Sequence, residues 1–131
     1  MRNKSIIDVF IPDGYKPKKV EKEAAWILAR NFKTVVRILR PTMGYKEKTP
    51  DFQIHEEFFE LKTLTSSKAE RVITVIRSAT KQSNNIVIDA RKTKIHEKRL
   101  IELCKEGMHY YKKVKKIILI IDKKKILDFY K

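Results

Sequence analysis

The segment TPDFQIHEEFFELKTL (residues 49–64) has the pattern of two short antiparallel strands joined by a tight turn. Apolar and polar residues alternate on either side of its centre, and alternation with a period of two is typical of strands with one buried face. If Ile54 and Glu57 close a two-residue connection, Phe52 lies opposite Phe59. The segment therefore predicts a hairpin whose register decides which side chains share a face.

The same register places three charged side chains on one face of the hairpin. Asp51 falls opposite Glu60, and facing residues in an antiparallel pair have Cβ atoms about 4.5–5.5 Å apart. Lys62 shares their face, whereas the core-facing residues are Phe52, Ile54, Phe59 and Leu61. Two facing carboxylates raise each other's proton affinity, so a bound cation would stabilise them, and their oxygens suit Mg²⁺ or Mn²⁺. The alternative is a solvated outer face on which Lys62 pairs with surface acids.

Size and charge limit the class of protein. The 131 residues predict a single domain over residues 1–131, with residues 1–16 as an N-terminal extension. The 31 Lys and Arg residues outnumber the 16 Asp and Glu residues and give a formal charge of +15. Such an excess favours a polyanionic partner, most often nucleic acid, although a basic protein without such a partner has the same composition.

Other classes of protein find little support in the sequence. The short apolar run near the N-terminus is broken by Asp8 and Pro12, so we expect no signal peptide, no membrane span and no membrane partner. Cys104 is the single cysteine, which excludes an intrachain disulfide. Its helical surroundings predict a half-buried structural thiol rather than a nucleophile.

Periodicity predicts nine elements in the order α-β-β-β-α-β-α-β-β. They are a helix over 18–32, strands over 33–39, 51–54 and 58–64, a helix over 66–82, a strand over 85–90, a helix over 96–107, and strands over 114–122 and 125–130. Ser66 or Ser67 is expected to cap the second helix with Glu70 closing a capping box, and Gly107 to end the third. This order predicts an α/β (α+β) sandwich, with a central mixed sheet flanked by helices on both sides.

One acidic residue of the first helix lies on its apolar side. Glu21 shares a face with Ala24, Ala25 and Leu28, at spacings of three, four and seven residues. Charged residues are rare on buried faces unless they are paired or functional, so Glu21 is a candidate site residue. Glu23 points away by the same geometry and is the weaker candidate.

The motif PDFQIHEEFFELK (residues 50–62) resembles the signature of the PD-(D/E)xK nuclease superfamily, which has an α-β-β-β-α-β core. Within it, the chain looks most like the tRNase domains at the C-termini of contact-dependent growth inhibition toxins and their mobile-element relatives. The similar segments are EKEAAWILARNF (21–32), TPDFQI (49–54), FFELK (58–62), KQSNNIVIDARKTK (81–94) and the closing KKIILIIDKKKILDFYK (115–131).

This resemblance implies roles for individual residues. Glu21, Asp51 and Glu60 would be ligands of Mg²⁺ or Mn²⁺, and Lys62 the catalytic lysine. Gln82 would contact a phosphate or a water beside the site, unless it is a helix-end residue that points to solvent. The activity implied is that of a metal-dependent tRNA or RNA endonuclease toxin. It would be delivered from another cell, act in the cytoplasm and be held in check by a small acidic immunity protein.

Basic residues near these motifs are candidates for binding nucleic acid. Arg91, Lys92 and Lys94 follow a central strand, and Lys81 follows the second helix. Lys68 begins that helix, where simple capping is the alternative to holding a phosphate.

Two other functions remain open at this point. One is a DNA endonuclease or junction resolvase of the same superfamily, and the other is a catalytically inactive nucleic-acid-binding module. Pure binding gains nothing from buried acids, so the acidic residues with Lys62 favour an enzyme, and RNA is the expected substrate rather than DNA.

Overall fold

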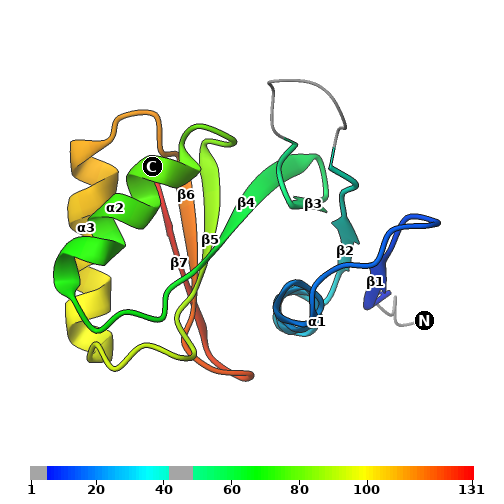
Figure 1. Ribbon diagram of the computed structural model, residues 1–131, viewed down its shortest axis with the longest axis horizontal. Helices are drawn as coiled ribbons and strands as arrows, with labels where there is room; N and C mark the ends of the chain where they lie inside the picture. The colour runs from blue at the N-terminus through cyan, green and yellow to red at the C-terminus, as the bar shows by residue number, and fades with distance from the viewer. Residues whose placement is uncertain (1–5, 42–48) are drawn as a thin grey trace, which may run out of the picture.

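The computed structural model describes residues 6–41 and 49–131. Three helices and a seven-stranded sheet are formed by these residues (Figure 1). In chain order the elements are β1 (Asp8–Phe10), α1 (Lys19–Phe32), β2 (Val35–Ile38), β3 (Phe52–Ile54), β4 (Glu57–Thr63), α2 (Ala69–Ala79), β5 (Asn85–Asp89), α3 (Glu97–Tyr110), β6 (Lys116–Ile120) and β7 (Ile126–Tyr130).

The sheet is mixed, and its spatial order follows the chain from β1 to β7. The pairs β1–β2, β4–β5 and β5–β6 are parallel, and the pairs β2–β3, β3–β4 and β6–β7 are antiparallel. Helix α1 packs on one side of the sheet, and α2 and α3 lie together on the other (Figure 1). The predicted mixed sheet with helices on both sides is thus confirmed.

The β3–β4 hairpin has the register that the sequence predicts. Phe52 pairs with Phe59, and Ile54 pairs with Glu57 across a two-residue turn. Phe52, Ile54 and Phe59 are buried under α1, and Leu61 packs against the same cluster. His55 opens the turn with a φ of 54°, in the left-handed region that tight hairpin turns require.

Two apolar clusters fill the two sides of the sheet. The cluster under α1 includes Leu28, Phe52 and Val87, and the cluster under α2 and α3 includes Ile76, Ile86 and Ile117. Cys104 belongs to the second cluster, and burial raises the pKa of its thiol to about 12. A thiol in this state is structural, as expected. Among the described residues no helix is both long and apolar enough to cross a bilayer.

Three details differ from the sequence-based expectations. Asp8–Phe10, within the expected N-terminal extension, forms β1 and pairs with β2. The N-cap of α2 is Lys68 without a side-chain cap, although the Ser66 hydroxyl accepts a hydrogen bond from the Lys68 N–H at 3.1 Å. Helix α3 runs through Gly107 to Tyr110, because Gly107 lies against Ile76 of α2 rather than at a helix end.

Candidate active site

Asp51 lies at the start of β3 and is fixed by hydrogen bonds on both sides. Its N–H donates to the Phe59 carbonyl at 3.0 Å, and its own carbonyl accepts from the Leu39 N–H at 2.9 Å. Its Oδ2 accepts a hydrogen bond from the Leu61 N–H at 2.8 Å. Asp51 therefore contacts the residues on either side of Glu60, and its carboxylate is held against the Glu60-Leu61-Lys62 segment.

Glu60 and Lys62 lie next to each other on β4. The Lys62 Nζ is 3.7 Å from Glu60 Oε2, and Glu60 is buried with 8% of its surface exposed. Their partners on β5 are Ile86 and Ile88, which belong to the cluster under α2 and α3. Directly paired residues of a sheet point to the same side, so Glu60 and Lys62 leave β4 on the side of α2 and α3.

Glu21 lies on α1 and is close enough to Asp51 to sense its charge. Tyr15 donates its hydroxyl proton to Glu21 Oε1 at 3.1 Å. Partial burial raises the pKa of Glu21, and the negative charge of Asp51 raises it further, against the opposing effects of Tyr15 and Lys18. A carboxyl group whose charge is disfavoured by a neighbouring acid is a suitable ligand for a cation.

The donor set fits a hard divalent cation in part. Glu21 and Asp51 supply the carboxylate oxygens that Mg²⁺ and Mn²⁺ prefer. Glu60 lies on β4 facing α2 and α3, whereas Glu21 lies on the opposite side with α1. In residues 6–41 and 49–131, no three acidic, His or Cys side chains are grouped so as to hold a metal. The three-carboxylate site therefore stays a prediction, with Asp51 near enough to Glu21 for its charge to act on it.

Gln82 follows α2, and its buried side-chain oxygen is an unsatisfied hydrogen-bond acceptor. Its Oε1 has no hydrogen-bond partner within the described part of the chain. The neighbouring Ser83 hydroxyl donates to the Phe58 carbonyl at 2.8 Å, which ties this segment to β4 two residues before Glu60. Buried acceptors in proteins are normally satisfied, so a water or ligand group is expected here. The role of Gln82 beside the site stays a prediction.

The predicted nucleic-acid-binding lysines fall into two places. Lys92 and Lys94 flank Thr93, whose hydroxyl donates to the Ser66 carbonyl at 2.7 Å and links their loop to the segment that holds Lys68. Lys81 lies at the far end of α2, about 16 Å along an 11-residue helix from Lys68. All four lysines are exposed, but they do not form a single patch.

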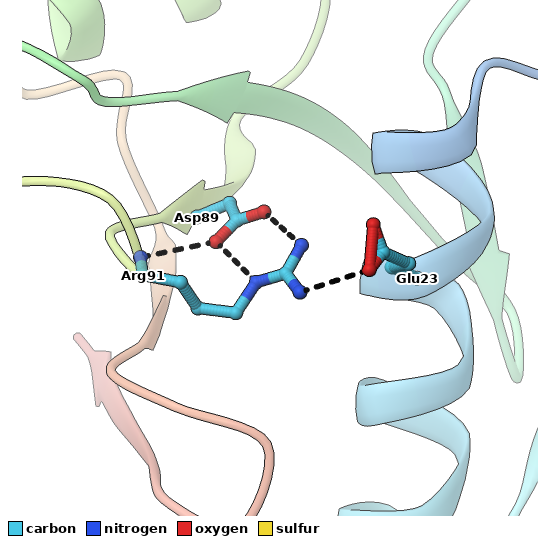
Figure 2. Close-up of polar contacts among 3 residues, drawn as sticks. All are labelled: Glu23, Asp89 and Arg91. Carbon is cyan, nitrogen blue, oxygen red and sulfur yellow. Dashed lines mark hydrogen bonds and ion pairs between the residues drawn. The ribbon is translucent and has the colours of Figure 1, made fainter.

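Arg91 forms a partly buried ion-pair network that the sequence interpretation did not predict (Figure 2). Its Nε and Nη2 donate to the two carboxylate oxygens of Asp89 at 2.9 and 2.7 Å. Its Nη1 is 3.6 Å from Glu23 Oε2 on α1. The hydrogen bonds to Asp89 raise the pKa of Arg91 above its ordinary value. Arg91 therefore joins β5 to α1, and much of its donor capacity is used inside the protein.

The sequence does carry a signal for this network. Asp89 ends an apolar strand and is only 3% exposed, and a buried carboxylate requires a partner. An Arg two residues later can supply it within a turn. Glu23, the weaker of the two candidates on the first helix, takes part in this network through its contact with Arg91.

These elements define an α+β domain, a seven-stranded mixed sheet with α1 on one side and α2 and α3 on the other. Among solved structures, the chain matches the CdiA-CT/CdiI toxin and immunity complex from Burkholderia pseudomallei with a TM-score of 0.69. The match covers 95% of this chain and 99% of that chain at 17% sequence identity, so it shows the fold alone.

The family is shown by the sequence itself. The family model of the contact-dependent growth inhibition CdiA C-terminal domain matches residues 48–126, which is more than half of the chain. The chain therefore belongs to the CdiA C-terminal domain family, the toxin domains of contact-dependent growth inhibition. A comparison with curated proteins finds no match.

Proposed function

We propose that the protein is a divalent-metal-dependent nuclease that hydrolyses phosphodiester bonds in structured RNA such as tRNA. The observation that carries this proposal is the hydrogen bond from the Leu61 N–H to Asp51 Oδ2. It holds the Asp51 carboxylate beside the strand that carries Glu60 and Lys62. Membership of a toxin family supports an enzymatic effector, and the resemblance to PD-(D/E)xK nucleases supports this chemistry.

Each residue of the site has a distinct role in this proposal. Glu21 and Asp51 would hold Mg²⁺ or Mn²⁺, and Glu60 would be the third ligand. When bound, the ion would polarise the scissile phosphate and lower the pKa of the attacking water. The Lys62 ammonium group would stabilise negative charge that develops on the phosphorane. The Gln82 Oε1 would accept a hydrogen bond from the attacking water and orient it.

The choice of a polyanionic substrate rests on charge. A formal charge of +15 attracts nucleic acid and favours phosphate contacts over base reading. Exposed lysines at both ends of α2 suit a folded RNA that spans several surfaces better than a short peptide or a small metabolite.

We also propose a cognate immunity protein as partner. The matched structure is titled as a complex of a toxin with its immunity protein. By charge complementarity, the partner of this basic chain would be acidic and would cover the site or an adjacent basic surface. The toxin would act in the cytoplasm of a target cell, and co-expression with the immunity protein would restore growth of a bacterial host.

The proposal is tested by incubating the protein with Mg²⁺ and, separately, with tRNA, plasmid and branched DNA. Cleavage of tRNA that stops on addition of EDTA is the expected result. Cleavage of DNA alone would make the protein a DNA endonuclease or resolvase, and tRNA binding without cleavage would make it a binding module. Cleavage that continues with the chelator present would refute metal dependence.

A pair of matched variants tests the site. Asp51→Asn should abolish cleavage while the fold is kept, because an Asn side-chain oxygen can still accept the Leu61 N–H. Asp128→Asn, which neutralises an exposed acid on β7, should leave cleavage unchanged. Full activity in Asp51→Asn would refute the assignment of this site.

A further inference from the structure

A hollow of about 480 Å³ lies between α1 and the β6–β7 turn, and its lining includes none of the predicted metal ligands. It is bounded by α1, by Arg91 after β5 and by the β6–β7 turn that carries Lys123. Its volume lies within the range of about 300–1,000 Å³ that is usual for small-ligand sites. The hollow is thus large enough for a nucleotide.

The lining is strongly basic. Lys19, Lys22, Arg30, Arg91 and Lys123 contribute five positive charges, and Glu23 is the one acid among the lining residues. Glu23 faces Arg91, which also pairs with Asp89. Within the described part of the chain, no carboxylate lies at ion-pair distance from Lys19, Lys22 or Lys123. The positive potential of the hollow is therefore not cancelled by the protein and suits a phosphate.

An aromatic side chain lies among these cations. Trp26 lines the hollow, and the Arg30 guanidinium lies 5.2 Å from its ring centroid. Base stacking on an aromatic ring contributes about 1–3 kcal/mol per base and tolerates any base, and a stacked Arg adds a second planar group. A flat ring surrounded by lysines matches one nucleotide of an unpaired strand, with its base on Trp26 and its phosphate on the lysines.

Helix geometry separates this hollow from the reacting groups. At 100° per residue, Trp26 and Arg30 lie about 140° and 180° around α1 from Glu21. Glu21 shares its side of α1 with the buried residues Ala25 and Leu28, so a nucleotide in the hollow would lie on the opposite side of the helix. A strand held there would be anchored at a distance from the cleaved bond.

We infer that the hollow between α1 and the β6–β7 turn binds an unpaired nucleotide of the RNA substrate, outside the catalytic centre. The inference deepens the proposed function and rests on it for the identity of the substrate. It predicts that a substrate with an accessible single-stranded segment binds better than a continuous duplex.

Trp26 is the only tryptophan in the chain, so its fluorescence reports on this hollow directly. The Asp51→Asn protein, which should not cleave, is titrated with a short single-stranded RNA, with an RNA duplex and with inorganic phosphate. Saturable quenching by the single-stranded RNA, with weaker quenching by the duplex and by phosphate, supports the inference. Unchanged fluorescence with all three probes, or equal quenching by duplex and single strand, overturns it.

A matched pair of double variants separates the hollow from general charge. Lys22→Ala/Lys123→Ala should weaken single-stranded binding and lower the slope of log affinity against log salt by about 0.7 per lysine removed. Lys98→Ala/Lys105→Ala removes the same charge from the exposed side of α3 and should affect quenching much less. An equal loss in both double variants overturns the inference, because it would reflect net charge alone.

A cleavage assay with Asp51 intact distinguishes the two proposals. Lys22→Ala/Lys123→Ala should raise KM for tRNA and leave kcat unchanged, since it removes binding and no reacting group. If the Lys22→Ala/Lys123→Ala variant cleaves tRNA with an unchanged KM, the inferred nucleotide site is overturned and the nuclease proposal stands. If the hollow binds RNA that is never cleaved, the nuclease proposal fails and the binding site stands.

Discussion

The raised pKa of Glu21 makes the stability of the folded protein depend on pH. Its pKa is raised in the folded protein, mainly by burial, with the charge of Asp51 adding to the effect. Such a carboxyl group binds more protons in the folded state, so stability falls as the pH rises from its unfolded pKa through its folded pKa. Glu21→Gln should therefore raise Tm at neutral pH, and this difference from the wild type should disappear in acid. Melting curves across this pH range test it, and a difference independent of pH would contradict it.

Arg91 neutralises a carboxylate that is almost fully buried. Only 3% of the Asp89 side chain and 15% of the Arg91 side chain are exposed. Arg91→Ala leaves Asp89 buried without its partner, and breaking a buried pair in this way costs about 3–5 kcal/mol. Urea unfolding should show this loss, whereas the double variant Asp89→Asn/Arg91→Met, which leaves no buried charge, should lose less. A loss below about 1 kcal/mol in Arg91→Ala would be typical of a surface pair instead.

Part of the candidate site could be predicted at the level of residues because a strand alternates its side chains. Once Phe52 and Phe59 are paired, Glu60 and Lys62 must share the opposite face of β4. What alternation does not determine is how α1 approaches the sheet. The distance between Glu21 and Glu60 depends on the packing of the whole domain, which sequence spacing does not contain.

Among the elements, the α2–α3 contact depends on a glycine. A Cβ added at Gly107 would collide with the Ile76 side chain. Alanine is favoured over glycine in a helix by about 1 kcal/mol, but overpacking a core typically costs about 1–3 kcal/mol. We therefore expect Gly107→Ala to destabilise the protein by up to about 2 kcal/mol in urea unfolding.

The same contact offers a matched control. Ile76→Val removes the methyl group that an Ala at position 107 would strike, so the double variant should recover much of the loss. Additive losses in the double variant would show that crowding is not the cause.

The end of α3 and strand β1 were mispredicted because local sequence patterns do not determine them. Gly107 looks like a helix end because glycine commonly ends helices, yet here its missing side chain permits two helices to touch. Strand β1 has three residues, too few for a periodic signal, and Phe10 on it is half exposed. By contrast, the β6–β7 hairpin was predictable, because its apolar runs lie on either side of a short lysine-rich turn.

At the scale of the whole molecule, basic groups lie on several separate parts of the described surface. Lys68, Lys92 and Lys94 lie near the carboxyl ends of β4 and β5, and Lys81 lies at the other end of α2. The basic hollow lies between α1 and the β6–β7 turn. A ligand that reaches all of these surfaces must be large and must carry many phosphates, which is the character of a folded RNA.

Binding of such a ligand should depend steeply on salt. Each phosphate contact releases a counterion, so a protein with six to ten contacts loses about 10³–10⁵ in affinity between about 50 and 200 mM salt. Titration of tRNA with the Asp51→Asn protein over this range measures the slope without cleavage. Asp51→Asn itself should change the slope little, because it removes no positive charge. An affinity that does not change with salt would mean that the +15 charge does not drive RNA binding. The excess of basic residues would then be explained by another partner, such as the acidic immunity protein.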